Sequence, residues 1–191
     1  MPYHQDEFKN SVAAETSLAA ASEFFTHPPL TALLLRADAV IFGGDHMRTL
    51  PLLFGICSAL LLFAVVRRRF DDRTALWSLA LYAVSFYGVW ASLMVDTDGA
   101  ILPTLFLASV YAYDRLRESS DRKLVWAGLL ALSLITGLLV KLSFILVVGA
   151  LLLDVLIHYR AMLRLRHFWL ALAGLGAFIA LSGLAFFVIH L

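Results

Sequence analysis

Long apolar runs separated by short charged loops make up the chain from residue 49 onward. The runs cover 49–66, 74–94, 99–113, 124–140 joined by a tight turn to 142–158, and 168–190. Crossing about 30 Å of hydrocarbon takes about 20 apolar residues, and most of the runs approach this length. The pattern therefore predicts an all-α, polytopic membrane protein with about five transmembrane helices.

Residues 1–48 precede these runs and have mixed polarity. Their first part, DEFKNSVAAETSLAAASEFF, has a modest apolar stripe that favours a helix lying along the membrane interface. HPPL ends that helix, because Pro28 and Pro29 lack backbone donors. TALLLRADAVIF predicts a second short amphipathic helix that ends at Gly43-Gly44. We expect an extracytoplasmic interfacial segment with an acidic motif over 1–48 and a transmembrane domain over 49–191.

Basic residues are concentrated in three of the loops. Most of the 15 Lys and Arg lie in 67–73, 114–123 and 159–167, which fall on one side of the membrane if the runs are spans. The positive-inside rule makes that side cytoplasmic. The opposite side then holds residues 1–48, the loop 95–98 and the turn near Lys141, so the remaining charged candidates share the outer face.

The composition supports a membrane protein and excludes several other classes. Hydrophobic residues make up 61% of the chain and charged residues 15%, whereas soluble domains have about 45–50% and about 25%. The single Cys57 allows no disulfide within the chain. No metal-ligand spacing or phosphate-binding glycine loop stands out, and the basic loops are topology signals, so nucleic-acid binding is not expected.

Several charged residues interrupt or border the apolar runs. Each of them has a structural and a functional interpretation. Asp96 and Asp98 in VDTDGA form either a polar turn or a site, because acids so close to hydrocarbon are functional candidates. Lys141 and Arg48 either reach headgroup water or face a phosphate or carboxylate. The Asp6-Glu7 pair is either a solvated terminus or part of a site.

The ordered set of these pieces resembles the polyprenyl-phosphate-sugar-dependent glycosyltransferases of the C type. More narrowly, it is similar to the protein mannosyltransferase and aminoarabinose transferase branch. The matching pieces are QDEF at 5–8, HPPL at 27–30, FGGDHMRTLPLLFG at 42–55, VVRRRFDDRTALWSLALYAVS at 65–85, VDTDGAILP at 95–103 and GLLVKLSF at 137–144. The resemblance rests on their order and spacing, since no single piece is specific.

The resemblance implies sugar transfer at the extracytoplasmic face of a bacterial cytoplasmic membrane. The donor would be a sugar on a polyprenyl phosphate, and the acceptor a lipid, a glycan or a protein. Asp6, in the acidic pair with Glu7, would be the general base for the acceptor hydroxyl. Asp98 or Asp96 would position the base, the acceptor or a divalent metal ion.

The resemblance also implies that three further residues contact the donor phosphate. Lys141 and Arg48 would stabilise its charge as it leaves. His27 stands where relatives often carry Lys, and it is only partly charged near neutral pH.

The ends of the chain differ from the family pattern. Relatives have a membrane span before the acidic pair and continue beyond a span like 168–190, so we expect the chain to correspond to the first portion of such an enzyme. The alternatives are a truncated, catalytically silent membrane subunit or scaffold, and a small transporter. A transporter predicts charges near mid-span and inverted repeats, which this sequence lacks.

Overall fold

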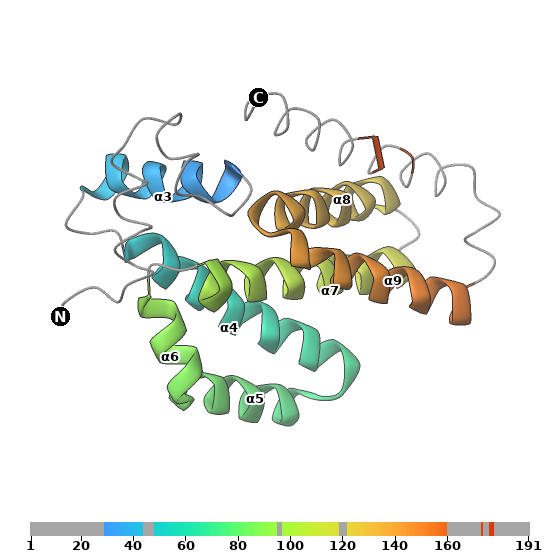
Figure 1. The fold of residues 1–191 in the computed structure, drawn as a ribbon. Coiled ribbons are helices and arrows are strands. Elements are labelled where there is room, and N and C mark those ends of the chain that lie inside the picture. The colour runs from blue at the N-terminus through green and yellow to red at the C-terminus, as the bar shows by residue number, and fades with distance from the viewer. Residues whose placement is uncertain are drawn as a thin grey trace. The chain divides into compact units, whose positions relative to one another are not determined.

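In the computed structural model, residues 29–43, 48–94, 97–118, 122–159, 173 and 176–177 are described, and they contain helices and no strand. The elements, shown in Figure 1, are α3 (Pro29–Phe42), α4 (Thr49–Arg69), α5 (Asp72–Val84), α6 (Phe86–Leu93), the π-helical turn η2 (Thr97–Ile101), α7 (Leu102–Glu118), α8 (Lys123–Val140), the 3₁₀ turn η3 (Leu142–Phe144) and α9 (Ile145–His158). The chain forms two units, Met1–Phe144 and Ile145–Leu191. The all-α prediction is confirmed over the described residues.

Two helices, α4 and α8, are long and apolar enough to cross a membrane. The pair α5 and α6 passes the same criterion together, but the two helices are bent by 59° and form a broken span or a re-entrant loop. Residues 142–158 form a shorter apolar helical stretch, and the predicted span 168–190 lies almost wholly outside the described residues. The described residues thus contain two candidate spans, or three with the bent pair, and the predicted count of about five stays a prediction.

The bend corrects the prediction of one continuous helix over 74–94. Ser85 adopts an extended conformation, and its hydroxyl lies 2.9 Å from both the Tyr82 carbonyl and the Gly88 N–H. It therefore caps the end of α5 and the start of α6 at once. Gly88 fits this corner because a Cβ there would lie 2.6 Å from the Ser85 hydroxyl oxygen and from the Tyr82 carbonyl oxygen.

A close helix packing lies between α4, α6 and the segment formed by η2 and α7. A Cβ on Gly55 of α4 would approach the Ser92 Cβ of α6 to 2.4 Å, so only glycine allows this approach. The hydroxyl oxygens of Ser58 and Thr104 lie 2.7 Å apart and are buried. Small residues and hydroxyl pairs of this kind are typical of helix interfaces in membranes.

The ends of α4 and α7 carry the first two basic loops, and they lie side by side. Arg69 forms two hydrogen bonds with Asp114, of 2.8 and 2.9 Å, and Arg68 pairs with Glu118. The ends of α4 and α7 therefore lie together, as the prediction that the loops 67–73 and 114–123 share one side of the membrane requires. The third loop, 159–167, lies outside the described residues apart from Tyr159.

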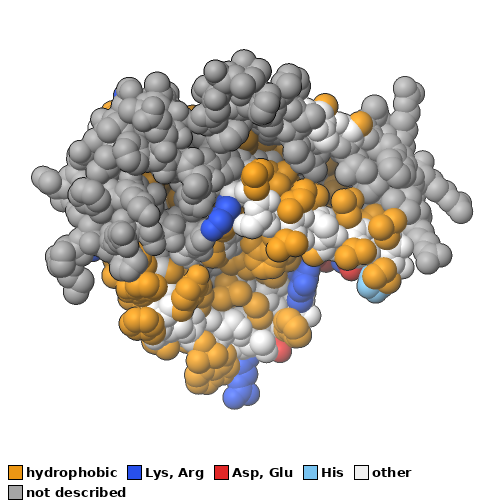
Figure 2. Space-filling model, viewed as in Figure 1, with side chains coloured by type: hydrophobic (Ala, Val, Ile, Leu, Met, Phe, Trp, Pro, Cys, Tyr) orange, Lys and Arg blue, Asp and Glu red, His pale blue; other side chains and the backbone are white. Residues whose placement is uncertain are grey.

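Large apolar side chains cover much of the visible surface of the first unit, as Figure 2 shows. On α5 and α6 the exposed ones are Leu76, Trp77, Leu81, Val84, Phe86, Tyr87, Val89, Trp90 and Leu93. An apolar surface this extensive is rare on a soluble monomer and is expected where lipid surrounds the protein.

Candidate functional site

Helix α3 packs against both α4 and α8 near one end of the first unit (Figure 1). Among its described side chains, Thr31, Leu35 and Asp38 are fully buried. They are spaced i, i+4 and i+7, so they lie on one face of the helix. Seven residues separate Thr31 from Asp38, which corresponds to about 10 Å along the helix axis. Gly43, at φ 89°, ends α3 at the predicted position.

Asp38 caps α4 from outside that helix. Its Oδ1 accepts a hydrogen bond of 3.1 Å from the backbone N–H of Leu50. Arg48, the residue preceding α4, provides no side-chain cap of its own, so the carboxylate satisfies a donor in the first turn of α4. The other oxygen, Oδ2, is buried without a hydrogen-bond partner among the described residues. Burial raises the pKa of Asp38, and the Leu50 N–H opposes this only in part.

Thr31 fixes the other end of α3 to α8. Its hydroxyl donates a hydrogen bond of 2.9 Å to the carbonyl of Val140, which is the last residue of α8. Lys141 follows in an extended conformation, and its N–H donates to the Gly137 carbonyl. Helix α8 therefore ends where the sequence predicts the tight turn between 124–140 and 142–158, and Lys141 is the first residue after the helix.

A close contact between Gly137 and Phe144 holds this turn. A Cβ on Gly137 would lie 2.3 Å from the Phe144 ring, which is buried. The ring of the 3₁₀ turn thus packs directly on the backbone of α8. This contact fixes the backbone around Lys141, between α8 and η3.

The backbone of Asp98 lies in the π-helical turn η2. The next residue, Gly99, packs so tightly on α6 that a Cβ would lie 2.7 Å from the Ala91 carbonyl oxygen. Ala100 and Ile101 are fully buried, and the Ala100 carbonyl accepts a 2.8 Å hydrogen bond from the Thr104 hydroxyl. The turn therefore has a fixed backbone. Single π-helical turns of this kind are frequent at functional sites.

The structure describes only some of the predicted site residues. Arg48 and Lys141 are half-buried and adjoin the two contacts of α3, so they lie at the same end of the unit. Asp6, Glu7, His27 and Asp96 lie outside the described residues, and of Asp98 only the backbone is described. The described residues contain no group of three or more His, Cys, Asp or Glu that could hold a metal ion.

Sequence analysis did not single out Asp38. The available signal was an acid inside the apolar stretch TALLLRADAVIF, five positions before the glycines that follow the helix. An acid on the buried face of a helix is unusual unless it has a partner. Here that partner is the N-terminus of another helix, which only the packing of α3 on α4 reveals.

Chemically, this end of the unit combines two cationic residues with a buried carboxylate. Arg48 directly precedes α4 and Lys141 directly follows α8, and α3 bonds both helix ends through Asp38 and Thr31. Such an arrangement suits an anionic ligand, because fixed positive groups stabilise charge without reorganising during a reaction.

Comparison with known proteins identifies a family for the chain. The model of the family described as dolichyl-phosphate-mannose-protein mannosyltransferase matches residues 26–186. No curated protein and no solved structure shows significant similarity to the chain.

Proposed function

The chain belongs to the dolichyl-phosphate-mannose-protein mannosyltransferase family, and on that premise we propose that it transfers a sugar from a polyprenyl-phosphate donor to an acceptor hydroxyl at the extracytoplasmic face of the membrane. The family is one of membrane glycosyltransferases of the C type. The match covers α3 through α9, which includes both helices that α3 connects.

The observation that carries the proposal is the family match together with the two cations at the α3 end. In the proposed mechanism, Arg48 and Lys141 bind the phosphate of the donor and stabilise its growing charge as the glycosyl bond breaks. Asp6, paired with Glu7, takes the proton of the acceptor hydroxyl as the new bond forms. The carboxylates of Asp98 and Asp96 orient the base, the acceptor or a divalent metal ion.

The proposed orientation rests on the charges at the two ends of the first unit. Four arginines follow one another closely over 67–73, and the basic loop 114–123 lies beside them. The positive-inside rule assigns this end to the cytoplasm and the α3 end to the outside. A bacterial cytoplasmic membrane supplies the corresponding donor, a sugar on undecaprenyl phosphate.

The test measures transfer from a labelled donor in membranes that contain the chain. Undecaprenyl-phosphate mannose and undecaprenyl-phosphate aminoarabinose serve as donors, and the label is followed into lipid, glycan and protein fractions. We expect transfer with the unaltered chain and none with Asp6→Asn, at equal amounts of inserted protein. Transfer at an unchanged rate in Asp6→Asn would overturn the role of the base. Absence of transfer from either donor by the unaltered chain would overturn the proposal and favour a catalytically silent subunit.

A further inference from the structure

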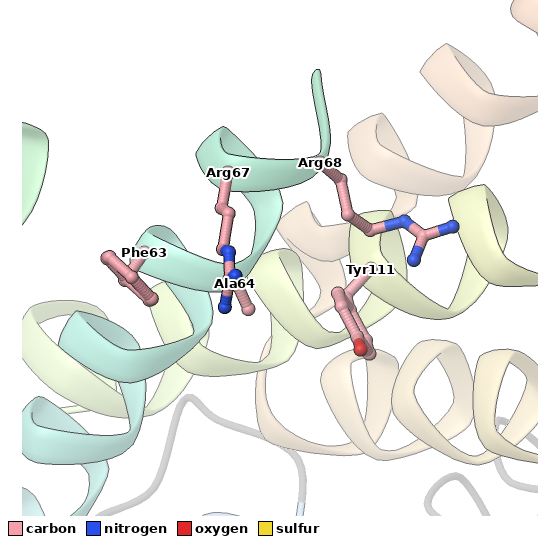
Figure 3. A pocket seen from close by; sticks show the side chains of 5 residues that line it. All are labelled: Phe63, Ala64, Arg67, Arg68 and Tyr111. Carbon is pink, nitrogen blue, oxygen red and sulfur yellow. The ribbon is translucent and has the colours of Figure 1, made fainter. Parts of the chain in front are cut away.

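The basic end of the first unit contains a pocket of about 340 Å³ between α4 and α7, shown in Figure 3. Phe63, Ala64, Arg67 and Arg68 of α4 and Tyr111 of α7 line it. Its volume is at the lower end of the range for small-molecule sites, about 300–1,000 Å³. It lies at the opposite end of α4 from Arg48, so it is distinct from the candidate site at α3.

The lining of the pocket changes from apolar to basic along α4. Phe63 and Ala64 precede Arg67 and Arg68 by one helical turn, or about 6 Å along the axis. Because α4 is a candidate span that ends at Arg69, the apolar part lies toward the hydrocarbon and the arginines lie at headgroup depth. A phospholipid has the same sequence of groups, with glycerol and acyl chains next to a phosphate.

The arginines retain donors for an anion. Arg68 places its guanidinium 5.9 Å from the centre of the Tyr111 ring and uses one nitrogen, Nη2, to bond Glu118. Its Nε is buried and has no hydrogen-bond partner among the described residues. Since a guanidinium offers five N–H donors, the bond to Glu118 leaves most of the group unused. Figure 3 shows Arg67 extending back along α4 past Ala64, and Arg68 extending in another direction above Tyr111.

The acids that pair with these two arginines are Asp72 and Glu118, and both are exposed. Arg67 bonds Asp72 at 2.6 Å, and the side chain of Asp72 is 71% exposed, while that of Glu118 is 63% exposed. Exposed ion pairs contribute about 0–1 kcal/mol, so a phosphate can replace Asp72 at little cost. In the other pair only Glu118 is exposed, while the Arg68 side chain is 19% exposed. Two adjacent arginines match a phosphate oxygen pair well, and they disfavour the quaternary ammonium of a zwitterionic headgroup.

We propose that the pocket formed by Phe63, Ala64, Arg67, Arg68 and Tyr111 binds the phosphate of one anionic phospholipid headgroup. The headgroup phosphate contacts Arg67 and Arg68, and its glycerol lies against Phe63 and Ala64. The inference uses only the pocket and the span α4, so it does not depend on the proposed sugar transfer.

Native mass spectrometry of the detergent-solubilised chain tests whether the pocket binds an anionic phospholipid. The chain is titrated with phosphatidylglycerol, with phosphatidylcholine of the same acyl chains, and with glycerol 3-phosphate. We expect one phosphatidylglycerol to be retained at least about tenfold more tightly than phosphatidylcholine, and glycerol 3-phosphate not to compete with it at equal concentration. Equal retention of both lipids would overturn the proposal, and full competition by glycerol 3-phosphate would identify a site for free phosphate instead.

Two sets of variants separate the pocket from general surface charge. Arg67→Gln with Arg68→Gln should remove the preference for phosphatidylglycerol. The control, Arg73→Gln with Lys123→Gln, removes the same charge from exposed positions at the basic end of the first unit. The control should keep the preference for phosphatidylglycerol. If both double variants lost the preference equally, the lipid would be attracted by the overall positive charge of this end and not by the pocket, which would overturn the proposal.

Filling the pocket gives an independent measurement that leaves every charge in place. Ala64→Trp should reduce retention of phosphatidylglycerol about tenfold or more, because the indole occupies the volume next to the arginines. Retention at the level of the unaltered chain, in a variant that melts at the same temperature, would contradict binding in this pocket.

Discussion

The carboxylate of Asp38, on α3, lies 3.1 Å from the backbone nitrogen of Leu50 and caps α4 across a helix–helix contact. Helix ends are usually capped by residues of the same chain segment, immediately before the first turn. Here Arg48 occupies that place without capping, so the cap couples α3 to the start of a candidate span. The same helix reaches the end of α8 through Thr31, so α3 holds the two termini that adjoin Arg48 and Lys141.

Asp38→Ala should be less stable than Asp38→Asn. The amide oxygen of Asn can still accept the Leu50 N–H, whereas Ala leaves that donor unsatisfied. Loss of an N-cap costs about 0.5–2 kcal/mol, and we expect this difference in the free energy of unfolding between the two variants. Unfolding by detergent titration measures it. Identical stability of the two variants would contradict the capping role.

The stability that Asp38 confers should depend on pH. Burial raises the pKa of this carboxyl group in the folded chain above its ordinary value of 3.8, so the folded state binds a proton more readily than the unfolded state. Stability therefore falls as the pH rises through the interval between the ordinary and the raised pKa, and it increases on acidification. Asn does not titrate, so Asp38→Asn is the reference. The unaltered chain should gain stability relative to Asp38→Asn when the pH is lowered from 7 toward 4, and a difference that stays constant or moves the other way would contradict this.

Gly137→Ala should destabilise the turn that contains Lys141. Its Cβ would lie 2.3 Å from the buried Phe144 ring, and overpacking of this kind costs about 1–3 kcal/mol. Gly128→Ala, in the same helix, is the matched control, because a Cβ there has no neighbour within 4 Å. We expect the control to be neutral or slightly stabilising. Combining Gly137→Ala with Phe144→Ala should cost less than the sum of the two single changes, and strict additivity in thermal unfolding would show that the contact does not matter.

Asp114→Asn should cost far more than Asp72→Asn, although both remove an acid that pairs with an arginine at the end of α4. The Asp114 side chain is only 6% exposed and accepts two hydrogen bonds from Arg69. Bonds to charged groups are worth about 1.5–3 kcal/mol, and Asp114→Asn should lose roughly that amount. The pair of Arg67 and Asp72 is largely exposed and should contribute about 0–1 kcal/mol. Equal effects of the two variants on the unfolding free energy would contradict this ranking.

Several boundaries follow directly from local sequence. The glycines after α3 and the lysine after α8 interrupt apolar runs, and both interruptions coincide with helix ends in the structure. These features are local. Glycine adopts a positive φ without steric cost, and a charged side chain is costly inside the hydrocarbon, whatever the distant segments do. The positive-inside rule likewise predicted from charge alone that the ends of α4 and α7 lie together.

Other features depend on contacts between distant segments and could not be predicted. Ser85 lies within an apolar run without proline, and its double capping is revealed only by the bend of α5 and α6. Asp38 lies 12 residues from its partner Leu50, and no periodicity in the sequence connects them. The pocket beside Arg68 also needs a residue 43 positions away, Tyr111, to complete it.

Lys141→Gln should impair sugar transfer more than any change at the other end of α8. If Lys141 bonds the donor phosphate, its loss removes a hydrogen bond to a charged group worth about 1.5–3 kcal/mol, which lowers kcat/KM for the lipid-linked donor about tenfold or more. Lys141→Arg keeps the positive charge and should retain most of the activity. Lys123→Gln removes the same charge at the first residue of the same helix and should leave transfer unchanged. A purely structural role would lower the melting temperature of Lys141→Gln in parallel with its activity, so the assay is paired with thermal unfolding. Full activity of Lys141→Gln, or equal losses in Lys141→Gln and Lys123→Gln, would rule out a specific contact with the donor.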